Sequence, residues 1–137
     1  MAKQISLQYL AGFFDGEGCV SFHNREKGSR SPVLCISVFQ RVPEIPKEFV
    51  RRFGGIIIKT GNGKLAGDGF RWRATTVKAY YALQALLPFL RVKKKQAVVG
   101  MKLASRSMLN VKHKHISSKE LKLREGLVWQ LRRLNHR

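Results

Sequence analysis

Negative charge is scarce in this sequence. Of 137 residues, only 8 are Asp or Glu, against 27 Lys or Arg, so the formal net charge is +19. Such a surplus repels itself unless a polyanion is near, and inside a cell the commonest polyanion is nucleic acid. A basic membrane-surface helix is disfavoured because the cations are spread along the whole chain. A basic protein without a dedicated partner stays as the alternative.

Cysteines and long apolar runs are also lacking. Cys19 and Cys35 make neither a disulfide framework nor a Cys-x-x-Cys zinc knuckle. No apolar run nears the roughly 18 residues that a membrane span needs, and the N-terminus lacks the apolar stretch of a signal peptide. Because 44% of the residues are hydrophobic, the chain can still bury a core. We therefore expect one intracellular domain over residues 1–137, with neither a membrane nor a small-molecule substrate as partner.

Hydrophobic periodicity predicts an α+β fold of the order αββαββα, with two further helices after the third. Helices are expected at 6–14, 43–53, 77–90, 93–105 and 117–134, and strands at 19–25, 33–40, 56–60 and 70–75. We expect Ser6 to cap the first helix, and Gly16 and Gly18 to end it in left-handed geometry. Trp72 and Trp129 are expected in the core. The strands would form an antiparallel sheet with helices behind it and a duplex in front.

Alternation along the strands places polar and cationic side chains on the face opposite the apolar one. Side chains on such a face can read base edges or contact phosphates. The DNA-binding candidates are Ser21, His23, Arg25 and Arg30 in the first hairpin, Ser37 and Arg41 on or after the second strand, and Lys59, Arg71 and Arg73 in the second hairpin.

Two acidic residues, Asp15 and Glu17, lie in one of the least polar stretches of the chain. Gly12 and Gly16, four residues apart, leave one helix face free for a second helix to approach, with Ala11 in the same contact. The approaching helix belongs either to this chain, in an intramolecular helix crossing, or to a second copy of the chain, in a two-fold interface. In a two-fold contact, paired Glu17 carboxylates would need cations between them, Mg²⁺ above all and Mn²⁺ in its place. Asp15 is expected instead to accept hydrogen bonds from free backbone amides.

Residues 10–18, LAGFFDGEG, closely resemble the motif of the LAGLIDADG homing endonucleases. Residues 87–97, LPFLRVKKKQA, resemble the second recognisable segment of that family. The resemblance implies the fold of that family and a homodimeric, divalent-metal-dependent DNA endonuclease. Such an enzyme hydrolyses both strands of a long pseudopalindromic duplex and leaves short 3′ overhangs. It also implies that Glu17 is a catalytic metal ligand, assisted by the backbone carbonyl of Gly16.

The same resemblance implies two further catalytic residues. Lys93 corresponds to a lysine near the scissile phosphate, although Lys94 and Lys95 compete for that assignment. Gln40 corresponds to a water-orienting glutamine, unless the register slips and places residue 42 or 43 there. Two other classes stay open: a catalytically inactive DNA- or RNA-binding protein of this fold, such as a maturase or transcription regulator, and a ribosome-like RNA-associated protein. A zinc site at residues 113–115 is disfavoured because no further ligand cluster completes it.

Overall fold

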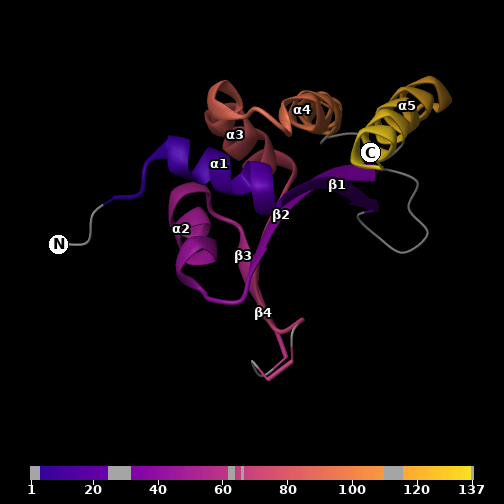
Figure 1. Cartoon of the computed structure of the whole chain (residues 1–137). Helices are drawn as coiled ribbons and strands as arrows, with labels where there is room; N and C mark the ends of the chain where they lie inside the picture. Colours follow the sequence, from indigo (N-terminus) through magenta and orange to yellow (C-terminus); the bar gives the residue numbers. More distant parts are fainter. Residues whose placement is uncertain (1–3, 25–31, 62–63, 66, 110–115, 137) are drawn as a thin grey trace.

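The computed structural model describes residues 4–24, 32–61, 64–65, 67–109 and 116–136. Its elements are α1 (Leu7–Glu17), β1 (Gly18–Asn24), β2 (Pro32–Gln40), α2 (Glu44–Phe53), β3 (Ile56–Thr60), β4 (Gly69–Thr75), α3 (Thr76–Leu86), the 3₁₀ turn η1 (Leu87–Phe89), α4 (Lys94–Leu109) and α5 (Ser118–Asn135) (Figure 1). The predicted α+β order is confirmed. The helix expected at 77–90 ends at Leu86, because its last residues, which include Pro88, tighten into η1.

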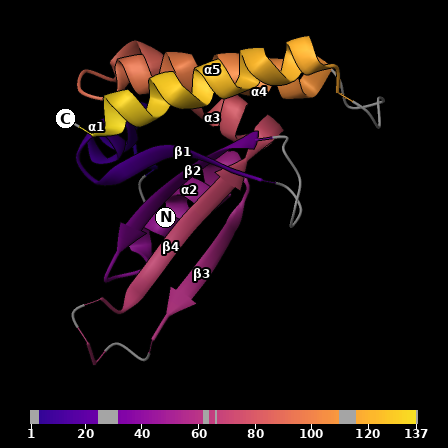
Figure 2. The same ribbon diagram turned by 90° about the vertical axis from the view of Figure 1, so that its right-hand side faces the viewer.

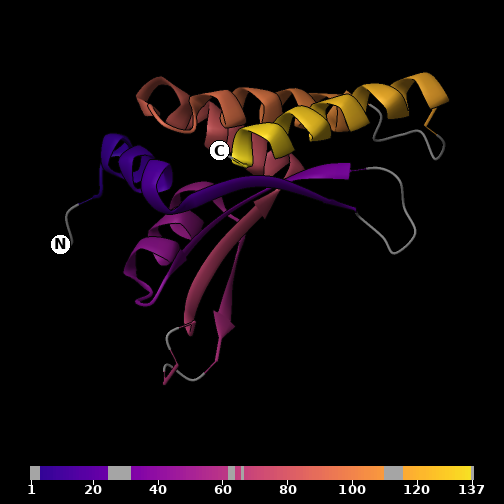
Figure 3. The same cartoon turned by 45° about the vertical axis from the view of Figure 1, so that its right-hand side comes forward.

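The four strands form one antiparallel sheet in the order β1-β2-β4-β3. Helix α2 lies behind the strands in the view of Figure 2, and α1, α3 and α4 lie on the same side as α2. Helix α5 runs beside α4, and the β3–β4 hairpin extends away from both (Figure 3). The expected layer of helices behind an antiparallel sheet is therefore confirmed, and no helix of the described residues covers the opposite face, which is called the helix-free face below.

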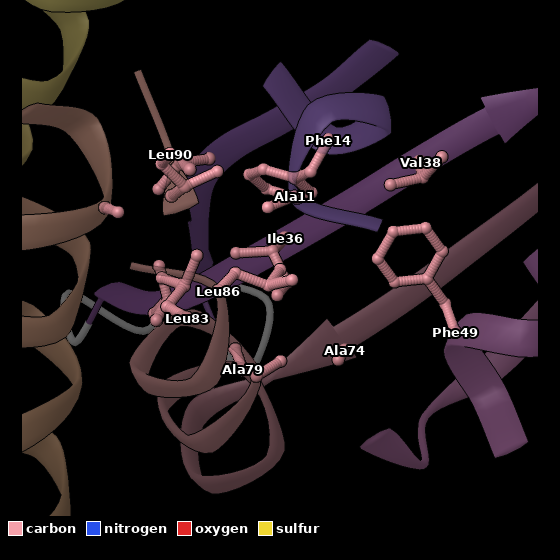
Figure 4. Close-up of a cluster of buried hydrophobic side chains, with 14 of the residues drawn as sticks. Ala11, Phe14, Ile36, Val38, Phe49, Ala74, Ala79, Leu83, Leu86 and Leu90 are labelled. Carbon is pink, nitrogen blue, oxygen red and sulfur yellow. The ribbon is translucent and has the colours of Figure 1, made fainter. Parts of the chain in front are cut away.

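The core lies between this helix layer and the sheet (Figure 4). Phe14 of α1, Ile36 of β2 and Leu83 of α3 are fully buried there. Trp72 is also fully buried and stacks on Phe49 at 4.6 Å between ring centroids, as expected for a core aromatic. The same expectation is wrong for Trp129, which is 64% exposed. Helix α5 buries Arg124, Val128 and Leu131, and the residue that follows Val128 is turned away from that stripe.

Ser6 caps the start of α1 as expected, accepting a 3.1 Å hydrogen bond from the Tyr9 amide.

Two glycines permit close packing around β1. Gly16 lies within α1, and Gly18 ends it in extended geometry with φ −81°, so the expected left-handed exit is wrong at both glycines. Glycine is required for space instead: a Cβ atom at Gly18 would lie 2.5 Å from the Phe14 ring. A Cβ at Gly100 would lie 2.8 Å from Leu34, so this glycine lets α4 approach the sheet.

Helix α5 is fastened to α4 at its start. Ser117 caps it by accepting a 3.1 Å bond from the Glu120 amide. The Glu120 carboxylate does not return to the cap: it accepts hydrogen bonds from the guanidinium groups of Arg106 and Arg124. Arg124, only 2% exposed, also donates to the Arg106 carbonyl at 3.0 Å.

The end of α5 is fastened to the edge strand β1. The Asn135 side-chain amide donates to the Val20 carbonyl at 2.8 Å, and the Arg132 guanidinium lies 4.9 Å from the Phe22 ring centroid. Edge strands present unpaired backbone groups, so α5 covers a surface open to unwanted strand pairing. Among the described helices, none combines the length and apolar character needed to cross a bilayer.

Candidate active site and nucleic-acid interface

The carboxyl end of α1 presents the acidic residue predicted to bind metal. Glu17 is the last residue of this helix, and both Glu17 and Gly16 are exposed. Carbonyl groups in the last turn of a helix lack intrahelical partners. This end of α1 therefore offers a solvent-facing carboxylate together with backbone oxygens, which are the ligand types that Mg²⁺ binds.

Asp15, two residues earlier, connects α1 to the segment that leads into α4. Its carboxylate accepts hydrogen bonds from the backbone amides of Arg91 at 2.8 Å, Val92 at 3.1 Å and Lys93 at 3.0 Å. The expectation that Asp15 binds free amides is confirmed. These three amides precede α4, where no helical carbonyl is available to them.

Lys93 differs from the two lysines that follow it. Its ammonium group donates to the Asp15 backbone carbonyl at 2.8 Å, and the residue is half-buried. Lys94 and Lys95 are exposed. The ammonium of Lys93 therefore binds the carboxyl end of α1 through Asp15, which is two residues before Glu17. The helix dipole also favours a cation at this end. Of the three lysines, Lys93 is the one held at the acidic helix end.

Gln40, the predicted water-orienting residue, is the last residue of β2 and is half-buried. Residues that are two apart in a strand share a face, so Gln40 shares the face of the fully buried Val38. Val38 pairs with Gly18, the first residue of β1, so Gln40 lies two residues beyond the part of β2 that pairs with β1. Val42 and Pro43 carry no side-chain hydrogen-bonding group, so Gln40 is the polar side chain among the three alternatives.

The small residues of α1 lie on two different faces. Gly12 and Gly16 are exposed, and a Cβ atom at either position would meet no atom within 4 Å. Ala11 is fully buried in the core of its own chain. Its assignment to the helix contact is therefore wrong, because successive residues of a helix point about 100° apart. The two glycines remain as the open strip of α1.

The helix-free face of the sheet carries most of the predicted DNA-binding residues that the structure describes. Ser21 and His23 share this face on β1, and the strand register places Ser37 directly opposite Arg73. His23 and Arg73 are exposed. Arg41 is exposed in the turn after β2, whereas the predicted Arg25 and Arg30 lie outside the described residues.

The expectation that Lys59 lies on the same face as Arg71 and Arg73 is wrong. Lys59 pairs with Phe70, whereas Arg71 pairs with Ile58 and Arg73 pairs with Ile56. Directly paired residues share a face, so Lys59 points to the side opposite both arginines. It is exposed because it lies near the end of the hairpin, away from the helix layer.

Apolar residues on the helix-free face were missed by the sequence reasoning. Ile56, 51% exposed, and the half-buried Ile58 and Phe39 share this face with Arg71. The pairing of β3 and β2 with β4 shows which of their residues share the face of Arg71 and Arg73. The sequence of β3 alone does not, because three consecutive isoleucines show no alternation of apolar and polar residues.

Arg71 is held in place before any ligand arrives. Its guanidinium donates to the Ser37 hydroxyl at 3.3 Å and lies 5.4 Å from the Phe39 ring centroid. Ser37 is only 7% exposed, so it supports Arg71 from beneath the surface. Ser21 similarly uses its hydroxyl to donate to the Cys35 carbonyl at 3.2 Å. Burial raises the pKa of the Cys35 thiol, although Arg73 opposes this shift.

A cationic groove adjoins the acidic helix end. It is bordered by the start of β1, the start of α4 and the end of α5, and its cations are Arg91, Lys93, Lys94, Lys95 and Arg133. No carboxylate lines this groove within the part of the chain that the structure describes. In the same part, no three His, Cys, Asp or Glu side chains gather into a metal cluster. The groove suits an anionic ligand such as a phosphate backbone.

Comparison with solved structures identifies this fold. The chain superimposes on the homing endonuclease I-CvuI in complex with its target with a TM-score of 0.77 and 20% identity, covering 98% of this chain and 84% of that one. For the archaeal intron-encoded homing endonuclease I-Vdi141I, complexed with DNA, the TM-score is 0.73, the identity 21% and the coverage 93% and 82%. For the LAGLIDADG homing endonuclease I-SmaMI bound to uncleaved DNA, the TM-score is 0.69 and the identity 19%, covering 94% of this chain and 45% of that one.

The chain therefore has the fold of the LAGLIDADG homing endonucleases over nearly its whole length, as the sequence motifs predicted. It spans less than half of I-SmaMI but most of I-CvuI and I-Vdi141I. Neither the protein-family models nor the curated protein sequences gave a match.

Proposed function

We propose that this protein is a homing-type DNA endonuclease that acts as a homodimer. It would hydrolyse one phosphodiester bond in each strand of a long pseudopalindromic duplex with a divalent metal, leaving short 3′ overhangs. One observation carries the proposal: α1 ends at an exposed carboxylate, Glu17, and the Lys93 ammonium is tethered to the Asp15 carbonyl two residues before it. Hydrolysis of a phosphodiester is assisted by a carboxylate that binds a metal ion and by a fixed ammonium that stabilises developing negative charge.

The residues at this helix end fit a Mg²⁺ ion, and Mn²⁺ in its place. The Glu17 carboxylate and the Gly16 carbonyl would hold it, since both are oxygen ligands. When bound, the metal would polarise the scissile phosphate and lower the pKa of a water. The chain's own part is to place Lys93 where negative charge develops and to orient water through the Gln40 amide.

Two copies of the chain are needed because each carries one such helix end, while a duplex has two strands. The exposed strip formed by Gly12 and Gly16 lets two α1 helices approach closely across a two-fold axis. Such a contact would bring both Glu17 residues to the centre of the dimer. A two-fold protein matches a two-fold target, with one sheet on each half-site.

The helix-free face of the sheet would bind the duplex. Arg71 is preorganised by Ser37 and Phe39, so it would reach a base edge with little loss of side-chain entropy. Exposed Arg73 and His23 would add base or phosphate contacts, and the exposed isoleucine Ile56 could meet a thymine methyl group. I-CvuI, I-Vdi141I and I-SmaMI have each been crystallised with DNA, which supports a duplex as the ligand of this fold.

Substitution of the acid tests the proposal. Glu17→Gln keeps the shape of the side chain but removes the charge that would bind the metal. We expect this variant to bind the target in Ca²⁺ as the wild type does, and to lose cleavage in Mg²⁺ by at least about 100-fold. Equal cleavage by both proteins would refute the role of Glu17. Sequence-selective binding without cleavage by the wild type would favour a catalytically inactive binder of the same fold.

A further inference from the structure

Asp15 holds Lys93 at two separate points. Its carboxylate binds the Lys93 backbone amide at 3.0 Å, together with the amides of Arg91 and Val92. Its backbone carbonyl accepts the Lys93 ammonium at 2.8 Å. One residue of α1 therefore fixes both the start of the lysine side chain and its end. Lys94 and Lys95, which no such contact holds among the described interactions, are exposed.

The segment 91–93 is a short connection between two helical elements. It follows η1 and precedes α4, and Lys93 supplies the carbonyl that accepts the first α4 hydrogen bond, from the Ala97 amide at 2.9 Å. Val92 is 70% exposed, so apolar packing contributes little to the position of this segment. A carboxylate that accepts three backbone amides is a strong, directional anchor, since bonds to charged groups are about twice as strong as neutral ones.

We propose that Asp15 is a positioning residue that holds the Lys93 ammonium at the carboxyl end of α1, the helix whose last residue is Glu17. This inference rests on the proposed function, because the position matters for catalysis only if Glu17 and Lys93 act on a phosphodiester. It assigns the two acids of the motif to separate tasks. Glu17 faces solvent and binds the metal, while Asp15 is turned to the protein and binds the chain that carries the lysine.

The placement of Lys93 can be measured without any cleavage assay. Brief acetylation with an N-hydroxysuccinimide ester, followed by peptide mass spectrometry, gives the reactivity of Lys93 relative to Lys94. In the wild type we expect Lys93 to react several-fold more slowly. In Asp15→Asn, whose neutral amide cannot accept three N–H groups, this difference should disappear. Glu125→Gln, which removes one exposed charge from α5, serves as the control and should leave the ratio unchanged.

A double-mutant cycle then connects this placement to the reaction. We expect Asp15→Asn to slow single-turnover cleavage in Mg²⁺ by about 10–100-fold, because a misplacement of roughly 1 Å can cost that much. DNA affinity in Ca²⁺ should change by less than about 3-fold. In a Lys93→Ala background, adding Asp15→Asn should slow cleavage by less than about 3-fold further, since the residue it positions is already gone.

Each outcome decides between positioning and mere stability. Additive losses in the cycle, or an unchanged acetylation ratio, would overturn the inference, because a generally weakened fold affects both backgrounds equally. Asp15→Ser replaces Asp15→Asn if the latter does not fold. If the wild type cuts no DNA at all, the proposed function is wrong, and the acetylation ratio alone still decides whether Asp15 holds Lys93.

Discussion

The charge of Glu120 is expected to stabilise the attachment of α5. This carboxylate, whose side chain is 13% exposed, accepts bonds from Arg106 and from Arg124 at 3.2 Å, and Arg124 is 2% exposed. Removing one partner of a buried ion pair typically costs about 3–5 kcal/mol. Arg124 keeps its bond to the Arg106 carbonyl and glutamine keeps one acceptor oxygen, so we expect Glu120→Gln to lower the free energy of unfolding by about 2 kcal/mol.

The effect should depend on pH in a defined direction. The hydrogen bond from Arg106 is the main cause that lowers the pKa of Glu120 below its ordinary value of 4.5, with Arg124 acting in the same sense. A carboxyl with a lowered pKa stabilises the fold above its ordinary pKa, and this contribution is lost as the pH falls through the folded-state pKa. The difference between wild type and Glu120→Gln should therefore be full at pH 7 and shrink below pH 4.5.

Thermal and urea unfolding at pH 7 measure this difference. A loss of 2 kcal/mol in a chain of this length corresponds to a fall in Tm of roughly 6–8 °C. Glu125→Gln, an exposed position on the same helix, is the matched control and should stay within about 0.5 kcal/mol of the wild type. If Glu120→Gln were no less stable than this control at pH 7, the ion-pair account of how α5 is held would be refuted.

Three further substitutions test other parts of the structure. Gly12→Ala should raise protomer stability by up to about 1 kcal/mol, because alanine favours a helix and the Cβ meets no atom, yet it should weaken the dimer in sedimentation experiments; tighter dimers would contradict the proposed interface. Gly100→Ala should lower the free energy of unfolding by about 1–3 kcal/mol in urea titrations, since its Cβ would lie 2.8 Å from Leu34; a gain in stability would show that α4 can move. Arg71→Ala should cost about 1–3 kcal/mol of DNA affinity and relax base preference at one position of each half-site, whereas Lys59→Ala should change no base preference in the same binding selection.

Much of the architecture follows from local sequence signals. The Ser6 and Ser117 caps and the alternation in β1 and β4 place elements within a few residues of where they occur. These signals are reliable because they rest on short-range geometry. The resemblance of residues 10–18 to a known motif then supplies the relative arrangement of the elements, which local periodicity does not contain.

The errors arose where a residue's direction depends on a distant partner. The parity of β3 is fixed by its pairing with β4, so the direction of Lys59 was misjudged. Ala11 and Trp129 were assigned by residue type, but the neighbours of α1 and α5 decide which helix face is buried. Only a pairing register or a helix contact can supply that information, and neither is local in sequence.

The candidate site was partly predictable for the same reasons. The acid at the end of α1 and the lysine at the start of α4 were found from their motifs. That Lys93 contacts Asp15 could not be predicted, because the two residues lie 78 positions apart in the sequence. The support of Arg71 by Ser37 likewise joins residues 34 apart on two strands.

The central claim is that this fold cuts DNA at a site with two-fold symmetry. The most direct measurement exposes a randomised duplex library to the purified protein in Mg²⁺ and, separately, in Ca²⁺, and sequences both the bound and the cut molecules. The account predicts one pseudopalindromic sequence bound in both buffers and cut, on both strands, in Mg²⁺ alone. A selected sequence that is bound in both buffers but never cut would contradict it.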